Sequence, residues 1–257
     1  MPPMKIARFS TPDGSESYGV IDGKNILGIN GTPYKSLDYS GAVYPLHSVK
    51  LLAPCAPSKI VCLGVNYHGH AREMGHTLPT APLIFLKPST TVIGPEEGII
   101  YPPMSQRVDY EAELAVVIKK SGWRISRENA LSHVLGYTCF NDITARDLQK
   151  IDGQWTRAKG FDSFASIGPW IETEADPGNL IVETYLNDER KQQGNTSDLI
   201  YPVDYLIHFI SHVMTLLPGD VIATGTPSGI GPMQVGDTVE IRISGIGSLK
   251  NRVIRRD

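Results

Sequence analysis

Val108-Asp109-Tyr110-Glu111-Ala112-Glu113-Leu114-Ala115-Val116-Val117-Ile118 is the strongest strand signal in the chain. Side chains alternate across a strand, so we expect Asp109, Glu111 and Glu113 on one face. Like charges on one face repel each other unless solvent or a cation separates them. A solvated polar face is the ordinary explanation, but the strand continues into a fully apolar run, which indicates burial. Buried carboxylates need a countercharge.

A further acid, Asp142, follows another largely apolar segment and lies in Asn141-Asp142-Ile143-Thr144-Ala145-Arg146. Carboxylates without a Cys or His ligand suit a hard cation, Mg²⁺ or Mn²⁺, before Zn²⁺. From spacing alone, a metal site and a solvated strand face both stay open.

Length and composition predict a turn-rich globular protein. At about 150 residues per domain, 257 residues predict one large domain, or one large and one small domain. The 25 glycines and 19 prolines exceed the average share without reaching that of low-complexity disorder. Residues 1–50 are typical of a β-meander, with strands at 5–9 and 18–21 and a turn at 12–14. Two prolines in segment 52–58 indicate a boundary.

The rest of the chain is predicted to be mostly β, with a few helices, and not an alternating βαβ pattern. Helical spacing predicts a helix over 127–135, with Ser126 as N-cap, and a second over 204–217 that Pro218-Gly219 ends. Strands are predicted at 59–64, 83–87, 108–119, 221–224 and 237–244.

Charge and hydropathy exclude several classes of protein. The 24 basic and 27 acidic residues are interspersed and form no basic stripe, so a nucleic-acid partner is not expected. The apolar runs are shorter than the ~20 residues of a membrane span, so no membrane partner is expected. The first residues lack the apolar segment of a secretion signal, and three cysteines without close pairing fit reduced thiols. We therefore expect a cytoplasmic protein.

Several motifs resemble the fumarylacetoacetate hydrolase family, in family order over about residues 58–256. They are the two acidic segments above, Phe85-Leu86-Lys87-Pro88-Ser89, residues 156–162, Gly168-Pro169-Trp170 and residues 217–229. The resemblance implies a mixed, mostly β roll (α+β) of stacked sheets, usually a homodimer. It also implies a small N-terminal β domain over residues 1–55 and a catalytic domain over 58–257.

The resemblance implies a divalent metal, Mg²⁺ or Mn²⁺, held by Glu111, Glu113 and Asp142. His70 and Glu73 are three residues apart, so a helical turn places them on one face. Such pairs are usually solvated, but a Glu can also hold the tautomer of a His and raise its basicity. In the family, Asn-Tyr-x-x-His-x-x-Glu-Met orders over the metal and activates water, and residues 66–74 fit that pattern.

Three further positions are candidates for substrate contacts. Lys159 is ordinarily a surface lysine; by resemblance it points into the site, where an ammonium stabilises a developing enolate oxygen. Gly225 and Thr226 lie in a glycine-rich loop whose N–H groups and hydroxyl can hold a carboxylate, although such a loop can also be a plain turn. Lys87 serves the same anion-binding region or packs beside Pro88.

Other features are given no catalytic role. The loop at 224–231 lacks the lysine of a P-loop, so nucleotide binding is not expected. His208 and His212 have helical spacing but no third zinc ligand. No Gly-x-Ser-x-Gly elbow is present, and Cys62 and Cys139 lie in apolar strands as inert thiols.

The predicted function is a metal-dependent C–C bond hydrolase acting on a 2,4-dioxo acid of the acylpyruvate or fumarylpyruvate type. A metal-chelated enolate would form, with His70 and Glu73 activating water. Relatives with the same metal core isomerise or tautomerise 2-hydroxy-dienedioates, or decarboxylate oxaloacetate, and motifs do not separate these reactions. A binding protein of the same fold with a vestigial site is the non-enzymatic alternative.

Overall fold

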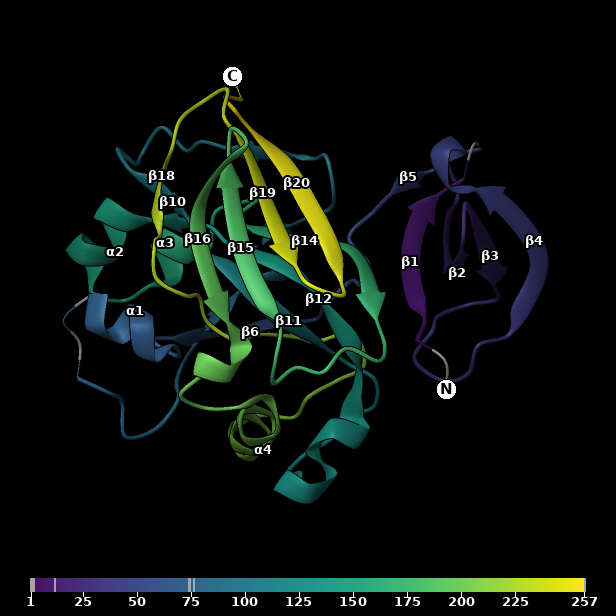
Figure 1. Ribbon diagram of the computed structural model, residues 1–257, viewed down its shortest axis with the longest axis horizontal. Coiled ribbons are helices and arrows are strands. Elements are labelled where there is room, and N and C mark those ends of the chain that lie inside the picture. Colours follow the sequence, from purple (N-terminus) through teal and green to yellow (C-terminus); the bar gives the residue numbers. More distant parts are fainter. Residues whose placement is uncertain (1–2, 12, 74, 76, 257) are drawn as a thin grey trace.

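The computed structural model describes residues 3–11, 13–73, 75 and 77–256. Figure 1 shows a small lobe built from the first strands beside a larger lobe that contains the other elements. The fold is mostly β with few helices, as predicted. Two residues of predicted features lie outside the described residues: Pro12 of the first turn and Met74 of the motif over residues 66–74.

The small lobe is an antiparallel meander. Its elements are β1 (Lys5–Ser10), β2 (Glu16–Asp22), β3 (Asn25–Ile29), β4 (Tyr39–Pro45), the 3-10 helix η1 (Leu46–Ser48) and β5 (Lys50–Leu51). Ala7, Phe9 and Ile26 form its small core. β1 also pairs with a strand of the larger lobe, Ile6 opposite Ile171, so the meander extends the main sheet. The division into domains at residues 55 and 58 stays a prediction.

The main sheet has twelve strands, ordered β4-β3-β2-β1-β14-β12-β11-β17-β6-β7, with β5 on β1 and β8 on β14. Its members in the larger lobe are β6 (Ile60–Gly64), β7 (Leu83–Lys87), β8 (Val92–Ile93), β11 (Ala112–Ile118), β12 (Val134–Asp142), β14 (Ala165–Glu172) and β17 (Val221–Ala223). Every residue of β11 is buried, because β12 and β17 flank it and both of its faces are covered.

Two smaller sheets complete the larger lobe. A five-stranded sheet contains β9 (Gly98–Ile100), β15 (Ile181–Leu186), β16 (Glu189–Asn195), β19 (Thr238–Ile243) and β20 (Gly247–Ile254). It packs on β11, β12 and β14, and the main hydrophobic core lies between these layers. A three-stranded sheet contains β10 (Val108–Tyr110), β13 (Thr144–Ala145) and β18 (Gly231–Met233).

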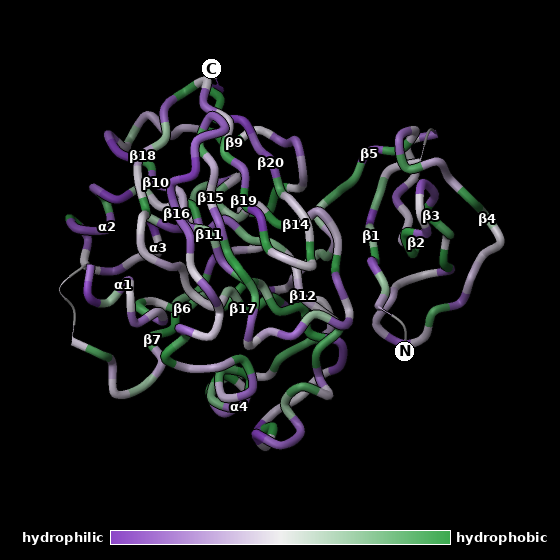
Figure 2. The backbone as a smooth tube through the Cα atoms, in the orientation of Figure 1, coloured by the Kyte–Doolittle hydropathy of each residue, from purple (hydrophilic) through white to green (hydrophobic). Residues whose placement is uncertain are grey.

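The helices are short and lie around the sheets. They are α1 (His68–Glu73), α2 (Arg146–Asp152), α3 (Thr156–Lys159), α4 (Val203–Val213) and the 3-10 helices η2 (Ser89–Thr91), η3 (Arg127–His133) and η4 (Thr196–Asp198). Figure 2 shows mostly hydrophobic strands at the centre of the larger lobe, whereas α1 and α2 at its edge are mostly hydrophilic. Among the described residues, none of the helices is both long and apolar enough to span a bilayer.

The predicted helix over 204–217 is wrong at its C-terminal end. α4 stops at Val213, and Met214 is already extended, with φ −148° and ψ 150°. Leu216 instead forms an isolated antiparallel bridge with Gly122, through two backbone hydrogen bonds of 2.9 and 3.0 Å. The apolar residues after Val213 therefore belong to an extended segment whose partner is distant in sequence.

The predicted helix over 127–135 is present but ends two residues early, and its predicted cap is wrong. Residues Arg127–His133 form a 3-10 helix, and Ser126 makes no capping hydrogen bond with its side chain. Val134 begins β12 and pairs with Ile118. Its apolar side chain fits a strand as well as a helix, and the sheet pairing decides between them.

The predicted continuous strand over 108–119 is interrupted at Glu111. β10 pairs with β13 and β18, whereas β11 pairs with β12 and β17, so the two halves belong to different sheets. The N–H group of Glu111 donates to the side-chain oxygen of Asn141 at 2.9 Å, in place of a ladder hydrogen bond. The alternation that put three acids on one face therefore does not continue through this residue.

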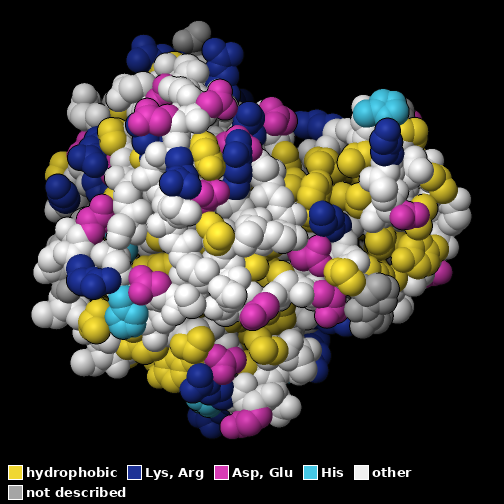
Figure 3. Space-filling view, in the orientation of Figure 1, with side chains coloured by type: hydrophobic (Ala, Val, Ile, Leu, Met, Phe, Trp, Pro, Cys, Tyr) yellow, Lys and Arg dark blue, Asp and Glu magenta, His cyan; other side chains and the backbone are white. Residues whose placement is uncertain are grey.

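Charged side chains are mixed on the surface. On the face that Figure 3 shows, basic and acidic side chains are interspersed and do not gather by sign. That distribution agrees with the interspersed charges of the sequence.

Candidate active site

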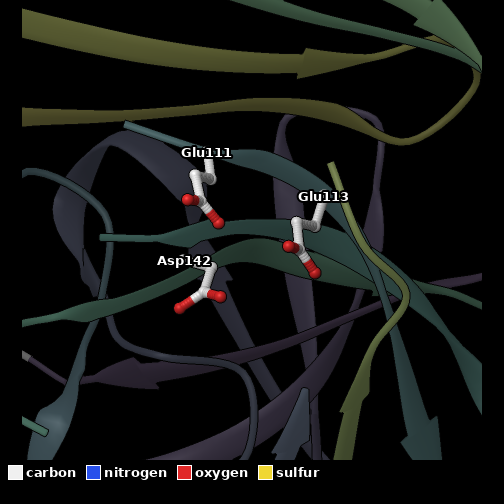
Figure 4. A group of neighbouring side chains, drawn as sticks. All are labelled: Glu111, Glu113 and Asp142. Carbon is white, nitrogen blue, oxygen red and sulfur yellow. The ribbon is translucent and has the colours of Figure 1, made fainter. Parts of the chain in front are cut away.

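Three carboxylates from neighbouring strands meet inside the larger lobe. Glu111 joins β10 to β11, Glu113 lies in β11, and Asp142 ends β12. Because Ala112 pairs with Asn141, these acids come to one end of the β11–β12 ladder. Figure 4 shows the three side chains next to one another, with their carboxylates directed to the same side. One oxygen of each lies within 4.8 Å of the others, and all three residues are buried.

The charges around these carboxylates are unevenly distributed. Lys159 Nζ donates to Glu111 at 2.9 Å and to Asp142 at 2.6 Å. Burial would raise the pKa of Glu111, but Lys159 and Arg146 outweigh it and lower the pKa. Burial would lower the pKa of Lys159, but Asp142 and Glu111 outweigh it and raise the pKa.

Glu113 is the carboxylate that lacks a cationic partner among the described residues. Its oxygen accepts a hydrogen bond from the Gly225 N–H group at 2.8 Å. Burial, together with the charges of Asp142 and Glu111, raises the pKa of Glu113 well above its ordinary value. A cation among the three carboxylates would relieve this repulsion, and an oxygen-only donor set suits Mg²⁺ or Mn²⁺. The residues therefore fit the metal that the sequence predicts.

Lys87 lies behind the carboxylates. Its side chain is fully buried, and its ammonium donates to Asp142 and to the Ile143 carbonyl oxygen. Burial lowers the pKa of Lys87 despite the neighbouring Asp142. The structure thus places Lys87 as a partner of a carboxylate, outside the cavity where a substrate would bind.

His70 and Glu73 lie on one face of α1, as their spacing predicts. His70 Nδ1 is 3.1 Å from Glu73 Oε2. Glu73 also accepts from the Gly229 N–H group, at 3.1 and 3.2 Å. Gly229 has φ +98°, and a Cβ there would lie 2.5 Å from the Lys191 carbonyl oxygen, so this contact depends on glycine. The helix is therefore held against the loop that carries Thr226.

A cavity of about 70 Å³ brings most of these groups together. Its lining includes the predicted residues His70, Glu111, Glu113, Lys159 and Thr226. The other lining residues are Leu63, Gly64, Val65, Phe85, Arg146, Gln149 and Trp155. Gly225 does not line the cavity but holds Glu113 from behind. Its φ is +100°, and a Cβ there would lie 2.8 Å from Asn66 Cβ, so this position also requires glycine.

Sequence reasoning assigned no role to Arg146 or Gln149. Arg146 donates to Asp109 at 2.9 Å and to Glu111, and it holds the Gln149 side-chain oxygen at 2.7 Å. Both residues lie on α2, shortly after Asp142, and line the cavity. Their spacing of three residues on a helix was the available signal.

Asp109 is separate from the metal-ligand group, in contrast to the prediction of one shared face. Its carboxylate is fully buried and accepts from Arg107 at 2.9 Å as well as from Arg146. This acid holds an arginine of the cavity wall and contributes no oxygen to the three-carboxylate cluster.

The features excluded by the sequence analysis have structural explanations. His208 Nδ1 lies 2.8 Å from the Ile125 carbonyl oxygen, and His212 Nδ1 lies 2.8 Å from that of His208. Cys62 and Cys139 are buried free thiols, and burial raises the pKa of each. These contacts fit structural roles.

Comparison with known proteins supports the family that the motifs resemble. The family model of the fumarylacetoacetate (FAA) hydrolase C-terminal domain matches residues 59–254, and that of the Rv2993c-like N-terminal domain matches residues 4–54. A 2-hydroxyhepta-2,4-diene-1,7-dioate isomerase from Mycobacterium marinum has a similar structure, with a TM-score of 0.92 and 44% identity. The match covers 98% of this chain and 99% of the isomerase.

Two further similar proteins carry other activities in their names. A maleylpyruvate hydrolase from Sphingobium sp. SYK-6, solved with manganese and pyruvate, has a TM-score of 0.82 and 32% identity, covering 99% of this chain and 100% of the hydrolase. The mitochondrial oxaloacetate tautomerase FAHD2B of Bos taurus is 41% identical over 82% of this chain and 72% of its own length. The chain therefore belongs to the fumarylacetoacetate hydrolase family.

Proposed function

We propose that this protein is a divalent-metal-dependent hydrolase that cleaves a C–C bond of a 2,4-dioxo acid of the acylpyruvate or fumarylpyruvate type. The observation that carries the proposal is that His70, paired with Glu73, lines the same cavity as Glu111, Glu113 and Lys159. In this proposal His70 is the base, Lys159 is the anion-stabilising cation, and the carboxylates are the metal ligands around one small space.

Mg²⁺ or Mn²⁺ would be held by Glu111, Glu113 and Asp142. When bound, the ion supplies Lewis-acid polarisation of substrate oxygens. The manganese in the maleylpyruvate hydrolase structure supports a metal of this kind. The formal charges of the three acids are balanced by Lys87, Lys159 and Arg146, so a divalent ion adds two positive charges. A dianionic ligand, such as fumarylpyruvate or an acylpyruvate enolate, would neutralise them.

His70 acts as the base in the proposed reaction. Its Nδ1–H group donates to Glu73, which leaves Nε2 unprotonated and able to take a proton from water. The hydroxide bonds to the C4 carbonyl carbon of the substrate, the C3–C4 bond breaks, and its electron pair passes to C3 as an enolate. The C4 fragment leaves as a carboxylic acid, and the Lys159 ammonium stabilises the enolate oxygen. The proton that His70 took from water then passes to C3 and gives the 2-oxo acid product.

Tautomerisation of oxaloacetate is the second candidate. The 41% identical Bos taurus relative is named for it. This reaction moves a proton at C3 and consumes no water, so it makes no use of a water-activating base. Isomerisation of hydroxydienedioates shares that property.

The decisive experiment compares His70→Ala with the wild type on a panel of acylpyruvates, oxaloacetate and hydroxydienedioates. Ultraviolet absorbance follows each reaction with Mg²⁺ and with a chelator. We expect His70→Ala to abolish hydrolysis and to leave tautomerisation largely intact, and chelation to stop both. His68→Ala, an exposed change on the same helix, is the matched control. Hydrolysis that survives in His70→Ala would remove the proposed water-activating role.

Oxalate binding measured with and without Mg²⁺ separates an enzyme from a vestigial binding protein. A functional site binds oxalate in a Mg²⁺-dependent manner, whereas a vestigial site binds neither Mg²⁺ nor oxalate. The homodimer and the cytoplasmic location stay predictions.

A further inference from the structure

Gln192 of β16 is a buried side chain that lies directly behind the cavity. It is 1% exposed, does not line the cavity and carries no charge. Its amide nevertheless makes four hydrogen bonds, to Ala112, Thr184, Thr226 and Pro227. Such complete pairing of a buried amide fixes its orientation.

Two backbone groups determine which end of the amide faces which partner. The Ala112 N–H group can only donate, so the atom 3.0 Å away is the Gln192 oxygen. The Pro227 carbonyl can only accept, so the atom 2.8 Å away is the Gln192 nitrogen. The assignment of oxygen and nitrogen therefore follows from the backbone.

The second N–H of this amide points at Thr226. Gln192 Nε2 lies 2.9 Å from Thr226 Oγ1, so the hydroxyl of Thr226 accepts. A hydroxyl has a single hydrogen, and within the described part of the chain no acceptor receives it from Thr226. Thr226 is 4% exposed and lines the cavity. Its O–H is thus left to donate to whatever occupies the cavity.

We propose that Gln192 is a positioning residue that sets the hydroxyl of Thr226 as a hydrogen-bond donor to an anionic oxygen of the bound ligand. Gln192 touches no reacting atom and acts through Thr226. The inference rests on the proposed function for the class of ligand, which is a 2-oxo acid. It adds that the Thr226 hydroxyl, held by Gln192, favours a ligand with an oxygen acceptor next to it.

A double-mutant cycle on the Mg²⁺-loaded protein tests this role, with oxalate as the probe and calorimetry as the measurement. Gln192→Glu keeps an oxygen for Ala112 and Thr184 but replaces the donor that faces Thr226 with an acceptor. The Thr226 hydroxyl then turns away from the cavity to donate to it. Thr226→Val removes the hydroxyl at similar volume, and Thr226→Ser retains it. Gln192→Leu repeats the cycle should Gln192→Glu fail to fold.

A hydrogen bond to a charged oxygen predicts that Gln192→Glu and Thr226→Val each weaken oxalate binding about tenfold or more. In the Thr226→Val background, Gln192→Glu should add no more than about a twofold loss. Thr226→Ser should bind oxalate like the wild type. Without oxalate, Mg²⁺ affinity should be unchanged in the Thr226 variants and no weaker in Gln192→Glu, which adds a negative charge near the metal ligands.

Three results would overturn the assignment of Gln192. The first is wild-type oxalate affinity in Gln192→Glu. The second is an equal loss of oxalate affinity from Gln192→Glu with and without the Thr226 hydroxyl. The third is weakened Mg²⁺ affinity, which would mean that Gln192 acts on the strand of the metal ligands through Ala112. The proposed function fails separately. If the wild-type protein binds Mg²⁺ but no oxalate, both proposals fall, whereas normal oxalate binding with additive losses removes only the role of Gln192.

Discussion

Carboxylates are neutralised in two different ways in this molecule. On β19, the Glu240 carboxylate accepts two hydrogen bonds from the Arg242 guanidinium, each of 2.9 Å, and a third from the Ser248 hydroxyl. The Lys250 ammonium lies 3.7 Å from the same carboxylate. These contacts, led by the hydrogen bond from Arg242, lower the pKa of Glu240 to about 2. In the three-carboxylate cluster, Glu113 has only a backbone N–H donor among the described residues, and burial raises its pKa.

The difference separates a structural acid from a functional one. Glu240 is fully paired by its own chain, so nothing further is needed to stabilise its charge. Glu113 is buried without a cation of its own, which costs folding free energy and leaves an attractive position for one. The neighbouring Asp109 is the intermediate case, since it is fully buried and also paired with two arginines. Substitution of each of the three acids by its amide is therefore expected to change the free energy of unfolding differently.

Asp109→Asn should have the largest effect on stability. The substitution leaves the buried Arg146 without one of its carboxylates, and breaking a buried pair costs about 3 to 5 kcal/mol. Urea unfolding measures the free energy of unfolding. The control Arg107→Gln removes the half-exposed partner and should cost less than about 1 kcal/mol. Equal small losses for both variants would mean that burial does not distinguish these pairs.

Glu113→Gln should change metal binding and stability in opposite directions. Loss of one carboxylate ligand should weaken Mg²⁺ affinity at least about a hundredfold, more than the loss of an outer contact. In a chelator at pH 8, the neutral amide should raise the free energy of unfolding by about 1 kcal/mol, because an unpaired buried charge is removed. Calorimetry and urea unfolding measure the two effects, with the exposed Glu128→Gln as control. A variant that is destabilised without metal would contradict the view of Glu113 as uncompensated.

Local spacing predicted much of the candidate site. The i,i+3 spacing of His70 and Glu73 and the strand pattern around Glu113 each depend on a few neighbouring residues, and the structure keeps both arrangements. The predicted strands at 59–64 and 83–87 agree with β6 and β7 within one residue. Patterns that a short segment determines by itself can be recognised from that segment.

Distant partners decided the features that the sequence could not show. The strand break at Glu111 depends on the Asn141 side chain, and the end of α4 depends on the Leu216–Gly122 bridge. The position of Arg146 depends on both Asp109 and Glu111. Gln192 carries no pattern of its own, because its role arises only where β16 meets the loop of Thr226. Each of these contacts is set by tertiary packing and overrides the local signal.

Glu240→Gln should have the smallest effect on the free energy of unfolding, and the pH dependence of that effect tests its cause. The pKa of Glu240 is lowered from 4.5 to about 2 in the folded protein, so its contribution is present above about pH 4.5 and is lost as pH falls toward 2. Because Arg242 and Lys250 are 44% and 41% exposed, solvent screening limits this contribution to about 1 kcal/mol. The difference in unfolding free energy between wild type and Glu240→Gln should therefore be about 1 kcal/mol at pH 7, shrink in high salt and vanish near pH 2. A difference that stays constant across this range would show that Glu240 stabilises the sheet through packing, and its contrast with Glu113 would then no longer be one of charge.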